Sequence, residues 1–337
     1  MRTTACLLVL SSTLFAQSIV VPNANATVPG TSGLNTIIRN AGNPRTYQYG
    51  VNAAELAGIP IGSVITGVSV RLYVSGVSIP AWPPADISWT TYDIWVGPAN
   101  PVAGWVGNPM LNYSSPPQQV RTGPMTLDGG VFADLATPGM PNPWAEFYFD
   151  FQVPYLYLGG DLALLFSHPG SNDPTAPQFP DVVAPNPATH GVSFSQAVQG
   201  GTAMVSASFY VMRLHYGYGA GCPSTAGKVP VLVQNADLTG GAGGNILLQI
   251  ANAAPGSLAV CAFGFTQLNV PIGGGCNLLV SPDVLVFAGI TNSHGRVVVS
   301  VPVAPGAVGN FFAQGAVLDA GLPLGFCVSN GAAPSAN

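Results

Sequence analysis

Few residues of this chain are of a type that could act as an acid, a base or a nucleophile. There are four histidines and 13 acidic residues, of which only Glu55 and Glu146 are glutamates. Two carboxylates beside a sugar bond suffice for glycoside hydrolysis, so this pair is the basis on which a hydrolase could be argued. Glu146, however, alternates with phenylalanines as an outward-facing strand residue does, and Glu55 falls in a turn. Because Gly-x-Ser-x-Gly and His-x-x-x-His motifs are also missing, we predict no catalytic residues and no enzyme, and an exported glycoside hydrolase is the least favoured function.

Four of the five tryptophans fall between residues 82 and 105, among several prolines. Flat indole faces on a loop or a sheet edge can stack on sugar rings. Trp82 precedes two prolines and Trp105 stands between two glycine-containing turns, so we expect both to be exposed. Trp89 and Trp95 stand at even spacing in one predicted strand, and we place both in the core. The alternative function is therefore a carbohydrate-binding protein that uses Trp82 and Trp105, with core packing of these two rings as the competing explanation.

Residues 169–191 form a long, polar, proline-rich stretch. Loops of this length without regular structure are often functional. Asn172, Asp173 and Asp181 offer oxygen ligands of the kind that Ca²⁺ prefers, so a structural calcium ion is the one cofactor considered. The stretch lacks the spacing of an EF-hand, and a solvated loop is the favoured interpretation. No other cofactor is predicted.

One cysteine, Cys6, lies near the N-terminus and four lie between residues 222 and 327. An even number in an exported domain implies two disulfides, for which four cysteines allow three pairings. We predict Cys261–Cys327 as a bridge in the core and Cys222–Cys276 as a bridge from the start of the domain to a central loop. Each closes a loop of over fifty residues, worth about 4 kcal/mol in the chain-entropy model. The long spacings make a zinc site a poor alternative.

The composition favours strands over helices. Of 337 residues only 6% are charged and 48% are hydrophobic, with 42 glycines and 32 prolines. Helices normally solvate their outer faces with Lys and Glu, whereas Ser, Thr, Asn and Gln suit strands and turns. The apolar content is too high for a disordered chain. The net charge of −5 and the lack of a basic patch argue against nucleic acid as a partner.

The first 16 residues have the pattern of an export signal. Arg2 is followed by an apolar stretch over residues 5–15, and Ala16 is a suitable cleavage point. The apolar stretch is too short to cross a bilayer, and no later run reaches 18 apolar residues. We therefore expect a protein that is secreted or held at the cell surface, with no membrane span after removal of the signal.

Alternation of apolar and polar residues is frequent along the chain. In residues 65–75, valines and a leucine alternate with Ser69 and Arg71, and in residues 145–153 phenylalanines alternate with Asp150 and other polar residues. Both patterns are typical of half-buried antiparallel strands whose polar side faces water. Further strands are predicted at residues 46–50, 89–96, 119–126, 161–167 and 204–216.

Residues 217–228 (GYGAGCPSTAGK) mark a boundary between two predicted domains. The first, residues 17–216, holds all five tryptophans. The second, residues 229–337, offers about seven strands, the number of an immunoglobulin-like (Ig-like) sandwich. The predicted fold class is therefore all-β, with two β-sandwich domains. The strands of the second are expected at 229–234, 245–250, 258–264, 277–287, 296–303, 310–318 and 324–329.

The chain after the predicted signal resembles exported bacterial proteins over nearly its whole length. Similarity to an uncharacterised family of exported β-sandwich proteins of planctomycete-type bacteria is carried by residues 46–73, 91–101, 118–127 and 149–172. The last stretch is similar to the final strands of a jelly roll, in which Pro, Tyr and a Gly-Gly-Asp turn follow an aromatic strand. A C-terminal module of many such proteins resembles residues 217–226, 275–285 and 311–319. The resemblance implies a jelly-roll-like domain followed by an Ig-like one, and it transfers no catalytic or binding residue.

Export, disulfides, two sandwich domains and the lack of a catalytic motif together favour a structural or interaction protein that acts outside the cell. Its partner would be an extracellular polysaccharide or another surface protein. The low charge fits a neutral glycan, which is bound by stacking and hydrogen bonds rather than by ion pairs.

Overall fold

The computed structural model of the chain describes residues 18–145, 149–174, 178–186, 188–195, 204–205, 208–234, 244–305, 309–333 and 335–336. In these ranges the chain is built from antiparallel strands, and its helices are short 3-10 turns. The predicted all-β class is therefore confirmed. The predicted export signal, residues 1–16, lies outside the described residues. Among the described helices, none has the combination of length and hydrophobicity that a bilayer crossing requires.

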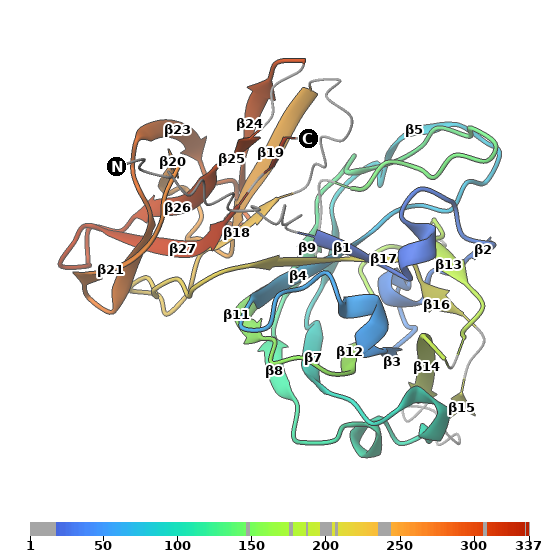
Figure 1. Ribbon diagram of the computed structural model, residues 1–337. Helices are drawn as coiled ribbons and strands as arrows, with labels where there is room; N and C mark the ends of the chain where they lie inside the picture. Colours follow the sequence, from blue (N-terminus) through green and yellow to red (C-terminus); the bar gives the residue numbers. More distant parts are fainter. Residues whose placement is uncertain are drawn as a thin grey trace, which may run out of the picture.

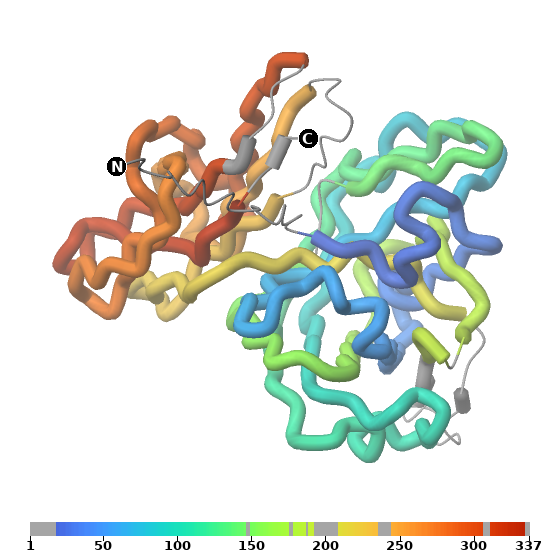
Figure 2. Tube along the Cα trace, viewed as in Figure 1, coloured from blue at the N-terminus to red at the C-terminus, as the bar shows by residue number. Residues whose placement is uncertain are grey.

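Two groups of sheets divide the chain, and we call them the first and the second domain (Figures 1 and 2). Described strands up to residue 217 pair only with one another, and those from residue 231 onward do the same. In Figure 1 the first domain runs from blue to yellow-green and the second from orange to red. The two lie against each other, with strands of both in contact.

The first domain contains two main sheets and several short pairings. Its elements are β1 (Ser18–Val21), η1 (Asn23–Asn25), β2 (Ser32–Gly33), η2 (Thr36–Ile38), β3 (Arg45–Val51), η3 (Ala53–Leu56), β4 (Val64–Val70), β5 (Ile79–Trp82), β6 (Ile87–Trp89), β7 (Asp93–Pro98), η4 (Val102–Gly104), η5 (Pro109–Asn112), β8 (Gln118–Arg121), β9 (Met125–Leu127), β10 (Phe132–Asp134), β11 (Phe149–Leu156), β12 (Leu162–His168), β13 (Asp181–Val183), β14 (His190–Ser195), β15 (Met204–Val205), β16 (Phe209–Tyr210) and β17 (Met212–Gly217). The main sheets have the orders β1-β17-β4-β11 and β15-β14-β3-β12-β7-β8.

These two sheets pack face to face on an aromatic core. Tyr49 of β3 lies edge-on to Phe166 of β12, with ring centroids 5.7 Å apart. Phe149 of β11 contacts Phe166 from the opposite sheet at 5.6 Å. Such edge-to-face pairs add about 0.5–1.5 kcal/mol each to the burial of their area. The aromatic rings therefore join the two layers of a sandwich.

The polar side of β4 is buried, which contradicts the expectation that it faces water. Ser69 is fully buried, and its hydroxyl lies 2.8 Å from Nε2 of His215 on β17. Arg71, just after β4, is also fully buried, and its Nε donates to Asp181 at 3.0 Å. The second domain packs beside β4 through the strand at Val231–Gln234. Alternation predicts which residues share a face, but it does not predict what covers that face.

The second domain is a smaller sandwich of three strands against four. Its elements are β18 (Val231–Gln234), β19 (Gly244–Ala251), β20 (Leu258–Gly264), β21 (Gln267–Gly273), β22 (Cys276–Val280), β23 (Val284–Ile290), β24 (Val297–Val303), β25 (Gly309–Asn310), β26 (Phe312–Leu318), β27 (Phe326–Ala332) and β28 (Ser335–Ala336). One sheet has the order β18-β19-β24, the other β23-β20-β26-β27, and β21-β22 and β25-β28 form separate ribbons. Their core is aliphatic, from Ile246, Leu248 and Ile250 on one sheet to Ala259 and Val317 on the other.

One of the two predicted disulfides is confirmed. Cys222 and Cys276 are bonded, with an S–S distance of 2.02 Å and Cα atoms 4.9 Å apart. The bond ties the segment that leads into the second domain to the start of β22. It therefore anchors the β21–β22 ribbon to the domain.

The predicted Cys261–Cys327 bridge is wrong, because both are free, buried thiols. Cys261 lies on β20 opposite Gly315 of β26, and Cys327 lies on β27 opposite Val317 of the same strand. Both side chains face the core, as expected, but β26 separates their strands. Neighbouring strands lie about 4.8 Å apart, so the two Cα atoms are beyond the roughly 7 Å that a disulfide can span.

Several predicted strands are interrupted, among them residues 119–126, which divide into β8 and β9, and residues 204–216, which hold parts of β15, β16 and β17. Residues 89–96 divide into β6 and β7, so Trp89 lies in the main core while Trp95 is half-buried in a second cluster. Residues 277–287 divide into β22 and β23, and β21 has no counterpart in the prediction. Short turns without Gly, such as the one between β6 and β7, are not visible as breaks in apolar periodicity.

Candidate functional site at the domain junction

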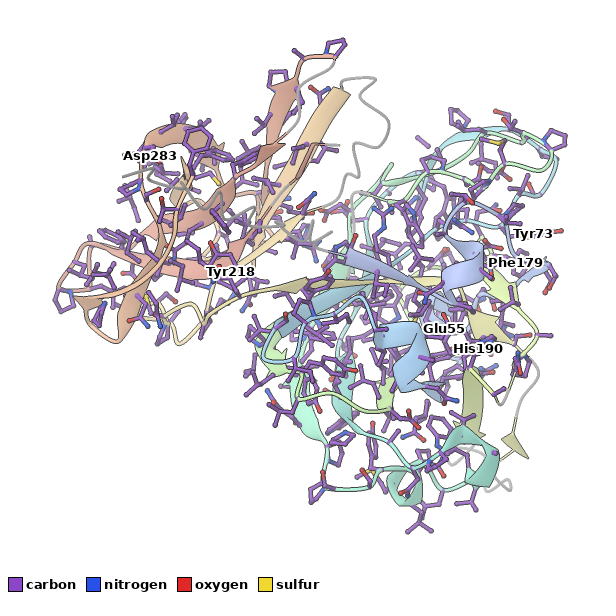
Figure 3. All side chains as sticks on the ribbon, in the orientation of Figure 1. Glu55, Tyr73, Phe179, His190, Tyr218 and Asp283 are labelled. Atoms are coloured by element: carbon purple, nitrogen blue, oxygen red, sulfur yellow. A yellow bond between two sulfur atoms is a disulfide. The ribbon has the colours of Figure 1, made fainter. Side chains whose placement is uncertain are left out.

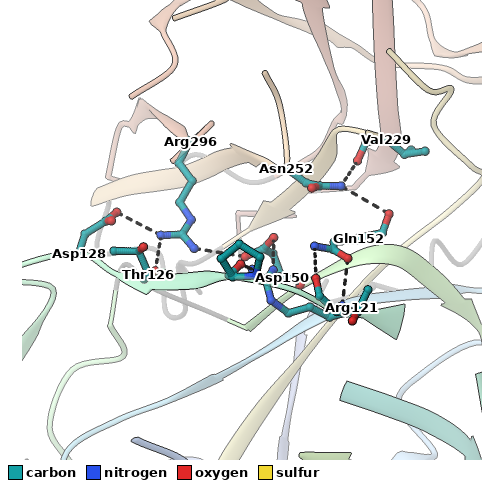
Figure 4. A network of polar contacts seen from close by, with 10 residues as sticks. Arg121, Thr126, Asp128, Asp150, Gln152, Val229, Asn252 and Arg296 are labelled. Carbon is teal, nitrogen blue, oxygen red and sulfur yellow. Dashed lines mark hydrogen bonds and ion pairs between the residues drawn. The ribbon is translucent and has the colours of Figure 1, made fainter. Parts of the chain in front are cut away.

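A large cleft lies between the two domains. It has a volume of about 570 Å³ and is lined by Ala81, residues 83–86 and residues 128–130 of the first domain and by residues 292–294 of the second. A smaller cavity of about 190 Å³ adjoins it and is lined by Arg121, Asp150 and Arg296, among others. The charged side chains of both domains meet here, as the close-up in Figure 4 shows.

The loop between β23 and β24 presents His294 and Arg296 to the first domain. Its shape is fixed by Asn292, whose Oδ1 accepts hydrogen bonds from the backbone N–H groups of His294 at 2.9 Å and Arg296 at 3.0 Å. Gly295 has φ +73°, and a Cβ there would lie 2.1 Å from the carbonyl oxygen of Ala253. Glycine is therefore required for the close approach of this loop to the chain beneath it.

Arg296 reaches into the first domain and holds three oxygens. Its Nη1 donates to the carbonyl of Thr126 at 3.0 Å and to Oδ2 of Asp128 at 3.3 Å, and its Nη2 donates to Oδ1 of Asp150 at 3.3 Å. Asp150 is only 4% exposed, and its other oxygen accepts from Nη1 of Arg121 at 2.9 Å. One buried carboxylate thus joins a guanidinium group from each domain (Figure 4).

The two arginines set the charge state of Asp150. Burial by itself raises the pKa of a carboxyl group, because it disfavours the charged form. The positive charges of Arg121 and Arg296 outweigh that effect and hold the pKa of Asp150 below its ordinary value. The carboxylate is therefore ionised at neutral pH, and the junction contains two ion pairs that share it.

His294 lies between two more carboxylates at the edge of the larger cleft. Its Nε2 is 3.2 Å from Oδ2 of Asp86 and 3.5 Å from Oδ1 of Asp128. The other oxygen of Asp86 accepts from the backbone N–H of Gly129 at 2.9 Å, and this hydrogen bond, together with His294, lowers the pKa of Asp86. Asp86 is more than half exposed, so water weakens these contacts.

These three side chains form the one group of potential metal ligands among the described residues, with ligand atoms within 4.8 Å of one another. Two carboxylates and an imidazole suit a divalent cation. The imidazole of His294 already contacts both carboxylates directly, and the guanidinium group of Arg296 already neutralises Asp128. The contacts present are those of an electrostatic latch between domains.

His215 provides a second polar link between the domains. Its Nδ1 lies 3.0 Å from the carbonyl oxygen of Gln234 at the end of β18, so Nδ1 carries the proton and Nε2 accepts from Ser69. Burial, with the nearby charge of Arg213, lowers the pKa of His215 to about 3. The ring is therefore neutral at physiological pH and serves as a fixed hydrogen-bonding bridge.

The tryptophans that were expected to be exposed are both buried, at 8% exposure each. Trp82 packs in the main core against Phe132, with ring centroids 5.8 Å apart. Trp105 donates from Nε1 to the carbonyl of Asn100 at 2.8 Å, and its ring fills the space where a side chain at Gly50 would lie. The prediction of a sugar-stacking pair is wrong, because proline and glycine neighbours indicate a loop without indicating whether its ring points outward.

The residues predicted to bind calcium have other partners. Asp181 accepts from Nε of Arg71 and from the backbone N–H of Gly30, at 2.8 and 2.9 Å to its two oxygens. The side-chain oxygen of Asn172 accepts from the backbone N–H of Ser88 at 2.8 Å. The structure thereby removes Asp181 from the predicted set and leaves Asn172 and Asp173 in a loop beside the larger cleft.

The two glutamates do not provide a described catalytic pair. Glu55 accepts from the backbone N–H of Asn23, while Glu146 lies outside the described residues. Figure 3 shows Glu55 and His190 in the same part of the first domain. Burial lowers the pKa of His190, whose Nε2 bonds the carbonyl of Ala184 at 3.2 Å. Glu55 and His190 thus each form a hydrogen bond to the backbone of another segment.

Sequence reasoning missed every charged residue of the junction. Asp150 was expected to face water, and Arg296 was expected only as the start of a strand. The low number of charged residues is the one signal that could have indicated them. The whole chain has eight basic and 13 acidic residues, and a charged side chain within an apolar strand needs a partner.

Comparisons with protein-family models, with curated proteins and with solved structures found no match to this chain.

Proposed function

We propose that this chain is a secreted or cell-surface structural or interaction protein without catalytic activity. The domain junction carries this proposal. Asp150 is buried between Arg121 of its own domain and Arg296 of the other, so separation of the domains would break the Arg296–Asp150 pair and leave the Arg121–Asp150 pair intact. Removing one partner of a buried ion pair costs about 3–5 kcal/mol, so we expect Arg296 to hold the two domains in one orientation.

A fixed orientation of the two sandwich domains suits an interaction protein, because it presents the binding surface of one domain at a constant angle to the other. The arrangement β18-β19-β24 against β23-β20-β26-β27 supports an Ig-like assignment for the second domain, because such sandwiches have three or four strands in each sheet. A jelly-roll-like first domain and membership of an exported planctomycete-type family remain part of the proposal. Fold likeness is the weaker support, since one fold serves many functions.

Of the two partner classes, another surface protein is favoured over a polysaccharide. The two tryptophans on which sugar stacking depended are buried in the first domain. The second domain instead exposes several large apolar side chains, among them Phe265, Leu285 and Phe287. An apolar surface without hydrogen-bonding groups fits a protein better than a glycan, whose hydroxyl groups need polar partners.

The proposal is tested at Arg296. The substitution Arg296→Gln removes the charge while keeping a polar side chain of similar length. We expect small-angle X-ray scattering to report a larger and more variable distance between the domains, while the circular dichroism of each sandwich is unchanged. Arg45→Gln is the matched control, because Arg45 lies in the first domain and donates to the neighbouring carbonyl of Pro44.

Two results would overturn the proposal. One is a scattering profile of Arg296→Gln that equals the wild type, because the junction would then not set the domain orientation. The other is hydrolysis of a polysaccharide by the purified wild type that is lost in Glu55→Gln or Glu146→Gln, because the protein would then be an enzyme.

A further inference from the structure

The sheet β23-β20-β26-β27 has an inner face in the core and an outer face directed away from it. Residues paired across strands share a face. Val260 on β20 lies opposite Phe287 on β23 and opposite Ala316 on β26, and Leu258 lies opposite Ile290. The outer face at this end of the sheet therefore consists of apolar residues, which we call the apolar face: Leu258, Val260, Ala262, Leu285, Phe287, Ile290, Ala316 and Leu318.

Half of the outer side of this sheet is covered, and the apolar face is the half that is not. The β21–β22 ribbon lies over β26 and β27, where Gln314 accepts from the backbone N–H of Leu279 at 2.9 Å and donates to the carbonyl of Asn277 at 3.0 Å. On β23, by contrast, Leu285, Phe287 and Ile290 are 66%, 62% and 65% exposed. A domain that covers one half of a sheet and leaves the other half apolar needs an external cover.

The size of the apolar face points to a specific contact. With Leu258 at 37% and Leu318 at 50% exposure, its large side chains present on the order of 500 Å² of apolar surface, near the upper end for a patch on a monomeric protein. Two such faces in contact bury about 1,000 Å² in total, the size at which specific interfaces begin.

The charges around the apolar face favour a second copy over a membrane. None of its residues is charged, and the acidic residues adjacent to its strands in sequence are Asp283, just before β23, and Asp319, just after β26. Figure 3 shows Asp283 on the side of the second domain that is turned away from the first, so the junction does not obstruct this end. A net charge of −5 repels an anionic lipid surface. An uncharged apolar face is complementary to itself, as a two-fold interface requires.

We propose that the apolar face is a self-association surface, on which the same face of a second copy packs, sheet against sheet. This inference deepens the proposed function and rests on it, because it names the partner of an interaction protein. Packing of two sheets about 10 Å apart uses the whole face, including Leu318 on β26, whereas pairing of two β23 edges would use β23 alone.

Sedimentation equilibrium of the full chain tests the proposal. Over concentrations from about 1 to about 100 µM, where interfaces of this size associate, we expect the wild type to reach twice the mass of one chain. Phe287→Glu and Leu318→Glu should each shift the midpoint of association to at least about tenfold higher concentration, because each buries a charge. Ile61→Glu is the control, since Ile61 is 76% exposed in the first domain and should leave association unchanged.

Three outcomes overturn the proposal. A wild type that stays monomeric over the whole range has no self-association surface. Loss of the dimer in Phe287→Glu but not in Leu318→Glu assigns the contact to the β23 edge instead of the face. Loss of the dimer in Ile61→Glu assigns the contact to the first domain.

The two proposals fail in different experiments. A wild type that is monomeric but gives the scattering profile of a rigid molecule rejects only the self-association surface. A wild type whose domains move relative to each other rejects the proposed function. Circular dichroism of the variants checks that each folds, and Leu285→Glu, at a second exposed position, replaces any that does not.

Discussion

The two domains are stabilised by different kinds of core. The first has a core of large aromatic rings, including Tyr49, Tyr92, Phe149 and Phe166. The second has one ring, Phe263, among the described buried side chains of its core, and is otherwise built from aliphatic residues, alanines and cysteines. A large ring buries 150–250 Å² and a small side chain much less. A crosslink therefore matters more to the second domain, and that is where the disulfide occurs.

Buried polar groups show the same division. Every described ion pair has at least one partner in the first domain, and the pair Arg71–Asp181 lies fully inside it. The buried histidines are also in the first domain, whereas His294 of the second is partly exposed. The first domain is thus sensitive to protonation, and the second to loss of its crosslink.

Acidification should have the largest effect, and it should act on the first domain. Burial lowers the pKa of His168 to about 4 and that of His215 to about 3, from an ordinary value of 6.5. Their contribution to stability is complete above pH 6.5 and is lost as the pH falls toward the folded-state values, because only the unfolded chain takes up the protons. At 1.36 kcal/mol per pKa unit, each histidine accounts for about 3 kcal/mol between pH 6.5 and pH 4.

Tryptophan fluorescence measures this loss in the first domain alone, since all five tryptophans lie there. Urea unfolding at several pH values should give a free energy of unfolding that falls with pH. His168→Gln and His215→Gln should each flatten this slope, whatever they do to stability at pH 7. An equal slope in either variant would contradict the assignment.

Removal of the disulfide should have the second largest effect, and it should act on the second domain. Cys222 and Cys276 are 54 residues apart, so the double substitution to alanine should lower the free energy of unfolding of that domain by about 4 kcal/mol. Hydrogen exchange of β20 and β26 measures it, while the tryptophan signal of the first domain should not change.

The free thiols provide the matched control. Cys261→Ala changes a buried cysteine of the same domain without breaking a crosslink and should cost about 1 kcal/mol. Alkylation of the unfolded, unreduced domain should label Cys261 and Cys327 and leave the other pair unlabelled. If none of the four cysteines were labelled, Cys261 and Cys327 would also be joined by a disulfide, contrary to the structure.

The predictable part of this fold is what period-two patterns encode. Leu258–Gly264 is β20 with the bounds expected, and the apolar side of β4 lies in the core. These features depend on residues close in sequence. The pattern also places Cys261 and Cys327 on the inner face, but whether they bond depends on strand order, which no local pattern contains.

The site was the less predictable part, because it is formed between distant segments. Asp150 and Arg296 are 146 residues apart and meet only once both domains have folded. The exposure of Trp82 and Trp105 is predicted from their neighbours in sequence, whereas Trp105 is buried against Gly50, which lies on β3. Burial of a side chain is a property of the tertiary contacts, so loop composition is a poor guide to it.

The smallest effect is expected at the exposed part of the junction. His294→Gln removes the ring between Asp86 and Asp128, and exposed ion pairs of this kind contribute less than about 1 kcal/mol. Because Arg296 still holds Asp128 and Asp150 in this variant, the scattering profile should stay that of the wild type, unlike the profile of Arg296→Gln. The exposed contacts then orient the loop, and the buried carboxylate holds the domains together. If Zn²⁺ raised the unfolding midpoint of the wild type but not of His294→Gln, the three donors would instead be a cation site.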